Sequence, residues 1–582
     1  MKKFSELQYK RIDKNEILDR INAFETMLLA ARDGKAMSNV LRAYYAYMEE
    51  YEYMYALSDI RFLQNTADRF YADEKKYWNE AEPEISERSV AFGNKLLEKD
   101  TRAKLEPHLP EILFRNLEIS AKAISPAILN EMKQENELVR RYSELVSRLT
   151  VNFNGEELPI NKLRKYFSDK DRNIRKKSHE AYDQMLQTHA AELDGMFDEL
   201  VRVRDAQAKK LGFKNFTQLG YLRMTRNCYG EKQVKAFRDS VLKHIVPLVT
   251  WLYEETGKNL DIKQRFPYDS GAFIEETPKP DGSPEDLLQK AGEMYKSLSS
   301  ETSELFGVFE NRGSFDVHSK KGKANRGFFS GIKKDNIPFI FANFNGTSKD
   351  VDILTHEFGH ALAFDQSGKA GNISPLRENT MDVCEIHSMT MERLTYPHMN
   401  KFFAGKSGDY VFQHLASSLS FIPYGCMVDE FQHLLYDFPG MTPQMRNDAW
   451  LALEKKYRPH LCLEGLPYYQ TGRFWQMQGH IFHSPFYFID YCLADIVALQ
   501  FDSLSDQNFK TAWTKYIALL KAGGTKTFLD MLEFIGMESP FKDQTISKVA
   551  HQCKLKITAG LSNYTQRGKN STNAGDNTLS RT

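Results

Sequence analysis

The feature that most constrains the fold is an apolar helical pattern that recurs along most of the chain. Residues three and four positions apart lie on one face of an α-helix, so apolar residues with this spacing form a stripe that can be buried. Two such stripes in the first third of the chain are Ile12, Ile17, Leu18, Ile21, Phe24 and Leu28, and Leu138, Tyr142, Leu145 and Leu149. The pattern predicts a mainly α-helical fold whose N-terminal part, residues 1–200, is a helical lobe.

One short segment interrupts the helical pattern. Residues Ile337 to Phe344 (IPFIFANF) form an apolar run with aromatic and β-branched side chains, which predicts a β-strand. The helical pattern resumes after this run and continues almost to the C-terminus. Residues 562–582 contain too few apolar side chains to order the chain, so we predict a disordered tail there.

Length and charge limit the architecture and the partners. A chain of 582 residues is longer than a single hydrophobic core supports, so we expect at least two lobes. Lys and Arg total 78, as do Asp and Glu, so no net charge attracts nucleic acid or an anionic membrane surface. We therefore predict that neither nucleic acid nor a membrane is a partner.

The N-terminal sequence and the cysteines indicate the compartment. Two lysines near the start are not followed by an apolar segment, and no apolar stretch reaches the roughly 20 residues that cross a bilayer. Six cysteines are scattered without a C-x-x-C pair, which favours reduced thiols over a disulfide framework. The cytoplasm is the predicted location, and no feature indicates an oligomeric state.

The segment from His356 to His360 has the H-E-x-x-H pattern. Residues four apart on a helix share a face, so His356 and His360 can direct two imidazole nitrogens at one zinc ion. Glu357 is placed to take a proton from water beside that ion. Gly359 is an unfavourable helix residue, and its presence predicts that another element packs closely against this helix.

A catalytic zinc site needs a third protein ligand, and the stretch from 378 to 394 offers one. Its residues Met381, Glu385, Ser388 and Glu392 fall on a common helical face. An acid in this apolar company is more easily explained as a ligand than as a core residue, so Glu385 is the predicted third ligand. Two interpretations of Glu392 remain open: a partner that orients a histidine ligand, or a solvated helix acid. We interpret His387 as structural.

The motifs together resemble the thimet oligopeptidase and oligoendopeptidase F family of zinc peptidases. The resemblance rests on the spacing of His356, Glu385 and Glu392 and on the run PFIFANFNGTSKDVDILTHEFGH, and it covers about residues 200–555. It is nearest to the shorter bacterial oligoendopeptidases. It implies a two-lobed helical clam with a deep substrate channel, and a small β-sheet beside the zinc-binding helix. In this interpretation residues 201–561 are the catalytic domain.

A second segment, GHIFHSPFYFIDYCLA (479–494), resembles the downstream substrate-binding stretch of that family. The resemblance implies that His480 and Tyr487 are catalytic residues that contact the transition state, and that Tyr491 and His483 bind substrate. Tyr487 and Tyr491 are four apart and are expected to share a helix face, with His480 in a loop before them. Fixed donors such as His and Tyr suit the oxyanion that forms during peptide hydrolysis.

These observations predict a zinc-dependent endopeptidase that hydrolyses internal bonds of short unstructured oligopeptides. One zinc ion per chain is expected on His356, His360 and Glu385, with Glu357 as the general base. The strand from Phe339 to Phe344 is a candidate to pair with an extended substrate.

Two other functions remain open. A metal-dependent exopeptidase of the carboxypeptidase type would need a terminal clamp. The sequence contains no motif for one, although single arginines such as Arg326 or Arg473 could serve. A non-catalytic peptide-binding protein would have no use for an acid at Glu357, and that residue therefore favours an enzyme.

Overall fold

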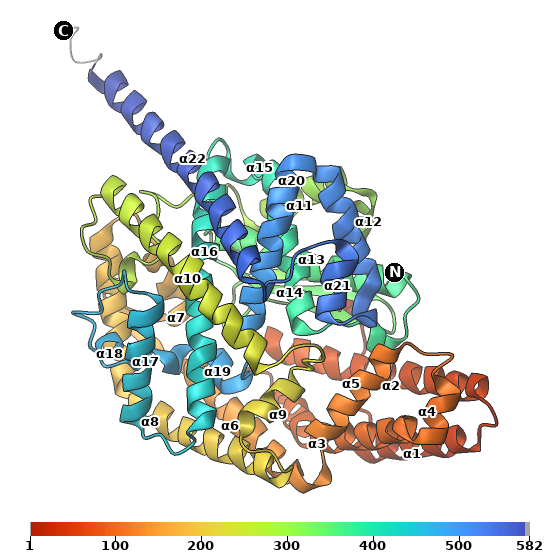
Figure 1. Cartoon of the computed structure of the whole chain (residues 1–582). Coiled ribbons are helices and arrows are strands. Elements are labelled where there is room, and N and C mark those ends of the chain that lie inside the picture. Colours follow the sequence, from red (N-terminus) through yellow and green to blue (C-terminus); the bar gives the residue numbers. More distant parts are fainter. Residues whose placement is uncertain (1, 577–582) are drawn as a thin grey trace.

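A computed structural model of the chain describes residues 2–576, and the side chains of residues 2–562. It is built mainly from helices (Figure 1), which confirms the mainly α-helical fold. The helices that precede the three-stranded sheet are α1 (Lys14–Ala30), α2 (Gly34–Gln64), α3 (Arg69–Leu97), α4 (Lys99–Leu105), α5 (Glu111–Ala123), α6 (Leu129–Arg148), α7 (Ile160–Leu163), α8 (Arg172–Lys210), α9 (Phe216–Arg223), α10 (Glu231–Asn259), α11 (Pro284–Leu298) and α12 (Ser300–Arg312).

The helices after the sheet contain the predicted site residues. They are α13 (Lys349–Lys369), α14 (Met381–Leu394), α15 (Asn400–Phe403), α16 (Ser407–Asp437), α17 (Pro443–Tyr457), α18 (Pro467–Gln470), α19 (Gly479–His483), α20 (Phe488–Ala522), α21 (Phe528–Ile535) and α22 (Asp543–Asp576). Helix α22 extends into the segment for which the sequence predicts disorder. Residues 577–582 and the side chains after 562 lie outside the described part, so the disordered tail stays a prediction.

Helices α1–α5 supply most of a separate hydrophobic core, to which Leu376 also belongs. Figure 1 shows these helices, in red and orange, gathered at one side of the molecule. Their core contains Ile17 and Leu28 of α1, Leu41 of α2 and Trp78 of α3. The largest core cluster of the described residues begins at Ala123, so α6 and α8 share it with the helices of the predicted site. This shared core does not mark a boundary at residue 200, and the division into two domains stays a prediction.

A three-stranded sheet lies directly before α13. Strand β5 (Ile337–Phe344) has the predicted bounds, and it pairs in parallel with β3 (Phe315–His318) and antiparallel with β4 (Phe328–Ile332). Since the strand order is β3-β5-β4, β5 is the central strand. The prediction that this strand pairs with a substrate is therefore wrong, because both of its edges are already hydrogen-bonded. A second small sheet joins β1 (Thr150–Phe153) and β2 (Glu156–Pro159).

The two faces of the larger sheet pack against different parts of the chain. Phe339 and Phe341 of β5 share a core cluster with Phe4 and with Leu57 and Ile60 of α2. The alternate residues Ile340, Ala342 and Phe344 belong to the main core, together with Val351, Leu354 and Phe358 of α13. The alternation of faces along a strand explains this division. The sheet is thus a fixed layer between the N-terminal helices and the helix with the H-E-x-x-H motif.

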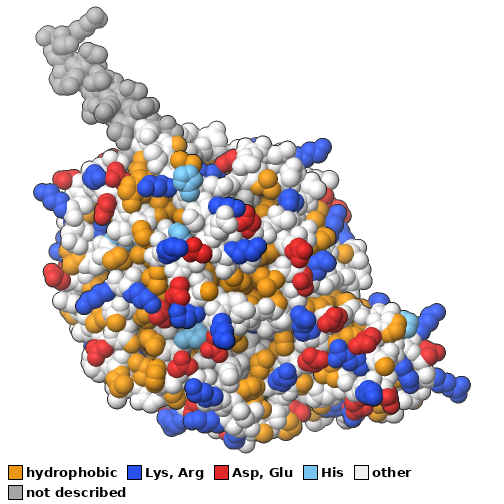
Figure 2. Space-filling view, in the orientation of Figure 1, with side chains coloured by type: hydrophobic (Ala, Val, Ile, Leu, Met, Phe, Trp, Pro, Cys, Tyr) orange, Lys and Arg blue, Asp and Glu red, His pale blue; other side chains and the backbone are white. Residues whose placement is uncertain are grey.

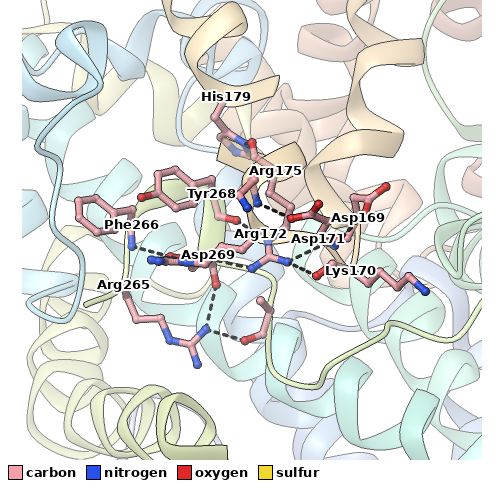
Figure 3. A network of polar contacts seen from close by, with 12 residues as sticks. Asp169, Lys170, Asp171, Arg172, Arg175, His179, Arg265, Phe266, Tyr268 and Asp269 are labelled. Carbon is pink, nitrogen blue, oxygen red and sulfur yellow. Dashed lines mark hydrogen bonds and ion pairs between the residues drawn. The ribbon is translucent and has the colours of Figure 1, made fainter. Parts of the chain in front are cut away.

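A buried polar network anchors the start of α8 (Figure 3). Asp269, in the loop after α10, is fully buried. It accepts from Arg172 Nε at 3.0 Å and from Arg175 Nη2 at 3.0 Å, and its backbone carbonyl accepts from Arg265 Nη1 at 3.2 Å. The positive charges of these arginines are partly satisfied by backbone carbonyls, for example that of Asp169, 2.8 Å from Arg175 Nη1. The network holds the first turn of α8 against the loop 265–272.

The surface shows no separation of charge on the face in Figure 2, where basic and acidic side chains are interspersed. Among the described helices, none combines the length and the apolar character that crossing a bilayer requires.

Candidate metal centre

Helix α13 presents both histidines of the H-E-x-x-H motif from one face. Asp350 and Asp352 lie in its first turn, where acidic side chains are favoured by the positive end of the helix. The Asp350 carboxylate also accepts the backbone N–H groups of Asn345 (3.0 Å) and Gly346 (2.7 Å), which ties down the turn between β5 and α13. The strand and the helix are therefore joined rigidly at the start of the site.

Helix α14 crosses α13 at Gly359. A Cβ atom at Gly359 would lie 2.6 Å from the carbonyl oxygen of His387 and 2.7 Å from the Cα of Ser388. Only glycine permits this approach, which confirms the expected close packing. The crossing brings Glu385 of α14 over the two histidines of α13.

His356, His360 and Glu385 converge on one point. Each offers a ligand atom, and these atoms lie within 4.8 Å of one another. Oε2 of Glu385 is 3.3 Å from Nε2 of His356 and 3.8 Å from Nε2 of His360. The Glu385 side chain is only 3% exposed, whereas His356 and His360 are 22% and 19% exposed. Glu385 therefore lies in the protein interior, whereas the two histidines are accessible to solvent.

The donor set fits a zinc ion. Tetrahedrally arranged ligand atoms, each about 2.1 Å from zinc, lie about 3.4 Å from one another, close to the observed spacings. Two imidazoles and one carboxylate are a catalytic donor set, because three protein ligands leave one position open. Although burial acts in the opposite direction, the hydrogen bond with His356 holds the pKa of Glu385 at about 2, so this carboxylate is ionised.

Glu392 lies against the first histidine and not in solvent. Its Oε1 is 2.6 Å from Nδ1 of His356, and its Oε2 is 2.8 Å from Nε2 of His414 on α16. Nδ1 of His414 is in turn 2.7 Å from the hydroxyl of Tyr396. Of the two interpretations that the sequence leaves open, the geometry matches a residue that orients His356, with Nε2 directed at the metal position.

Glu357 is buried beside the three ligands. Burial raises its pKa to about 7, although the neighbouring His356 acts in the opposite direction. The backbone N–H of Phe329, in β4, lies near this carboxylate and acts to lower its pKa. A carboxyl group with a pKa near neutrality can both accept and return a proton.

His480 and His483 occupy different environments on the short helix α19, where the sequence predicts a loop. The ring of His480 is half-buried, and its Nδ1 is 3.1 Å from Nε2 of Gln478. Burial lowers the pKa of His480 to about 4, so the ring is neutral at neutral pH. His483 is exposed, and its Nδ1 contacts the hydroxyl of Ser484 at 3.0 Å.

Tyr487 contacts Glu385, and Tyr491 lies beside Tyr487. Tyr487 is the residue before α20, and its hydroxyl donates to Oε1 of Glu385. Its ring centre is 4.9 Å from that of Tyr491 and 5.6 Å from that of His480. Burial and the Glu385 carboxylate raise the pKa of Tyr487, so the phenol keeps its proton. The segment 479–491 therefore lines the same site as α13 and α14.

The structure also contains contacts that the sequence analysis missed. His414 is one, since it follows Glu392 by more than twenty positions on another helix and no spacing links the two. The Phe329 amide beside Glu357 is another, because a backbone group leaves no signal in side-chain chemistry. His387 is 2% exposed and burial lowers its pKa to about 3, which agrees with a structural residue.

Two family descriptions match most of the chain. "Peptidase M3 N-terminal domain" matches residues 4–124, and "Peptidase family M3" matches residues 165–551, which include all of the predicted site residues.

Individual relatives agree with this match. The chain is 23% identical over 545 residues to an oligoendopeptidase F homolog of Borreliella burgdorferi, with 89% of each chain covered. It is 26% identical over 258 residues to oligopeptidase PepF of Bacillus subtilis, a match that spans 43% of this chain and 36% of that protein. The solved structure of PZ peptidase A with an inhibitor superposes with a TM-score of 0.93 at 35% identity, covering 96% of this chain and 99% of the other.

Proposed function

The chain belongs to peptidase family M3, and on that premise we propose that it is a zinc-dependent endopeptidase of short unstructured oligopeptides. The observation that carries the proposal is the convergence of His356, His360 and Glu385 next to the Glu357 carboxylate. These three residues would hold one zinc ion per chain. When bound, zinc supplies Lewis acidity, which polarises a peptide carbonyl and makes water acidic enough to attack near neutral pH.

Glu357 moves the proton in the proposed reaction. Its carboxylate accepts a proton from the attacking water and then donates it to the nitrogen of the leaving amine. Its burial beside the ligands keeps bulk water from competing for that proton. An acid at this position is not needed for a purely structural site, which favours the enzyme over a non-catalytic binding protein.

His480 and Tyr487 are the proposed donors to the oxyanion. The hydroxyl of Tyr424 donates to Oε1 of Gln478 at 2.9 Å, which directs the amide nitrogen of Gln478 at Nδ1 of His480. Since Nδ1 accepts this hydrogen bond, the ring proton is on Nε2, where it can be donated to a substrate. Tyr491 and the exposed His483 are placed for contacts further along a bound peptide.

We transfer the proposed pairing with substrate from β5 to the edge strand β4. Gly331 of β4 lies opposite Pro338, which has no N–H to give, so this is a pair without hydrogen bonds. By alternation Phe329 and Gly331 direct their N–H and C=O groups away from β5, and Phe329 is the residue whose amide lies beside Glu357. An extended peptide paired with β4 would therefore pass Glu357, with affinity from the main chain and little side-chain selectivity.

The test is a digest of an unstructured peptide library by the zinc-loaded protein, read by mass spectrometry. Internal cleavage of peptides that are blocked at both ends is the expected result, together with loss of activity in a chelator and its return with zinc. Cleavage that requires a free terminus would instead show an exopeptidase. Binding of peptides without cleavage would show the non-catalytic alternative.

The substrate channel and the cytoplasmic location are further parts of the proposal. A channel predicts that unstructured peptides of roughly five to twenty residues are cut while folded proteins are spared, because only an extended chain can pair with a strand edge. Efficient digestion of a folded protein under native conditions would contradict the channel.

A further inference from the structure

The backbone of the segment 479–487 is held in place by two buried arginines. Helix α19 has only five residues, so its last carbonyl groups have no partner within the helix. Buried carbonyls of this kind are costly unless another group donates to them. The donors come from distant parts of the sequence, α8 and the loop after α9.

Arg204 of α8 donates to the end of α19. This side chain is fully buried, and its Nη1 donates to the carbonyl of Ile481 at 3.1 Å while its Nη2 donates to that of Phe482. These carbonyls directly follow His480 in the chain. The planar guanidinium thus engages two successive peptide groups at once, which a lysine ammonium does not reproduce.

Arg226 holds the other end of the segment. Its Nη2 donates to the carbonyl of Phe486 and to Oδ1 of Asp490 at 2.9 Å, and its side chain is 2% exposed. Phe486 has a φ of 67°, a left-handed conformation that is strained for a bulky residue. Its N–H donates to Gln432 at 2.9 Å, so both peptide groups of Phe486 are fixed by partners. The next residue is Tyr487.

Both guanidiniums have their charge balanced by a buried acid. Nε of Arg204 donates to Glu135 at 2.6 Å, and this glutamate also accepts from Arg223 at 2.8 Å and from Gln207 at 2.9 Å. Asp490 plays the same part for Arg226. A buried ion pair adds little net stability over well-packed apolar groups, so the inference rests on the carbonyl contacts of the two arginines and not on the ion pairs themselves.

The geometry points to Arg204 and Arg226 as positioning residues that hold His480 and Tyr487 at the metal centre. The inference rests on the proposed peptidase function. Arg204 acts through His480, since it fixes the peptide groups that follow that residue. Arg226 acts through Tyr487, since it holds the preceding residue in the left-handed conformation that turns the Tyr487 hydroxyl toward Glu385.

The catalytic test uses Arg204→Lys and Arg226→Lys in the zinc-loaded full chain. Each is expected to lower kcat roughly tenfold, with KM changed less than roughly twofold, because displacement of the donors weakens the transition state more than the bound substrate. The zinc content should equal that of the wild type. Arg175→Lys is the matched control. Arg175 is also buried, pairs with Asp269 at 3.0 Å and donates to the backbone carbonyl of Tyr268 at 3.0 Å, and neither partner belongs to the segment 479–491. This variant should lower the melting temperature to a similar extent but leave kcat unchanged.

Double variants separate positioning from general destabilisation. In the His480→Ala background, Arg204→Lys should cost little further kcat, and the same is expected for Arg226→Lys in the Tyr487→Phe background. Losses that multiply in full would overturn the inference, because the arginines would then act independently of the two donors.

Hydrogen exchange tests the same inference without catalysis. Amides of 479–491 should exchange faster in Arg204→Lys and Arg226→Lys than in the wild type or in Arg175→Lys. Unchanged amide exchange in both variants would show that the arginines do not hold the segment 479–491, even if activity falls. A zinc-loaded wild type that cleaves no peptide would instead contradict the proposed function, and the exchange result would still decide whether the arginines hold the segment.

Discussion

The helices α13 and α14 and the segment 479–491 meet at one site, but they are built differently. On α13, His356 and His360 are placed by one helical turn, and Glu385 is placed by the crossing with α14 at Gly359. The segment 479–491 contains a five-residue helix and a left-handed phenylalanine, and its shape depends on hydrogen-bond partners from α8, α16 and the loop after α9.

The two regions hold their functional side chains in place in different ways. Regular helices hold the proposed zinc ligands through many backbone hydrogen bonds, so a single distant substitution has little effect on the spacing of these ligands. The irregular segment has few internal hydrogen bonds, and its donors depend on a small number of buried side chains. We therefore expect substitutions in α13 and α14 to abolish zinc binding or proton transfer. Substitutions in the segment 479–491 should lower kcat only in part.

The largest expected effect is on the helical side of the comparison. His360→Ala should abolish stable zinc binding and with it all measurable peptidase activity, because two remaining ligands do not hold the ion. Zinc content by atomic absorption and a peptide assay are the measurements. His551→Ala, on the exposed face of α22, is the control and should keep both. Full zinc content in His360→Ala would show that the ligand assignment is wrong.

The next effect separates metal binding from proton transfer within α13. Glu357→Gln should keep one zinc ion per chain and the wild-type melting temperature, but lose roughly a thousandfold in kcat because the amide accepts no proton. Single-turnover kinetics with zinc quantified in the same sample are the measurement. Near-normal turnover in this variant would show that Glu357 does not transfer the proton.

On the irregular side the expected effect is smaller. His480→Ala should lower kcat roughly a hundredfold, with a smaller change in KM and unchanged zinc, because a donor to the oxyanion is lost. His483→Ala is the natural comparison on the same helix. Since His483 is exposed and contacts Ser484, its change should act mainly on KM. Equal effects of the two substitutions on kcat would break the distinction between them.

The smallest expected effect concerns the residue that supports a ligand. Glu392→Gln should weaken zinc binding roughly tenfold to hundredfold, since the orientation and basicity of His356 depend on this carboxylate. Competition with a chromophoric chelator measures the affinity. Activity should return when zinc is in excess, which distinguishes this change from Glu357→Gln. Unaltered zinc affinity would show that Glu392 is structural.

Several features were predictable because they depend on neighbours in the sequence. The strand β5, the helix after it and the close packing at Gly359 follow from side-chain pattern and from the cost of glycine in a helix. The role of β5 in the sheet was not predictable. A strand pattern indicates burial, but it contains no information on which strands pair at each edge, and β5 is central.

The sequence by itself determined the mainly helical fold and the placement of His356, Glu357 and His360 on one helix. These features follow from helical periodicity, which local hydrogen bonds impose on any sequence of this kind. Only the tertiary structure decided that Glu392 joins His356 to His414, and that Arg204 and Arg226 hold the segment with His480 and Tyr487. These contacts join helices separated by long stretches of chain, and their geometry exists only once the helices have packed.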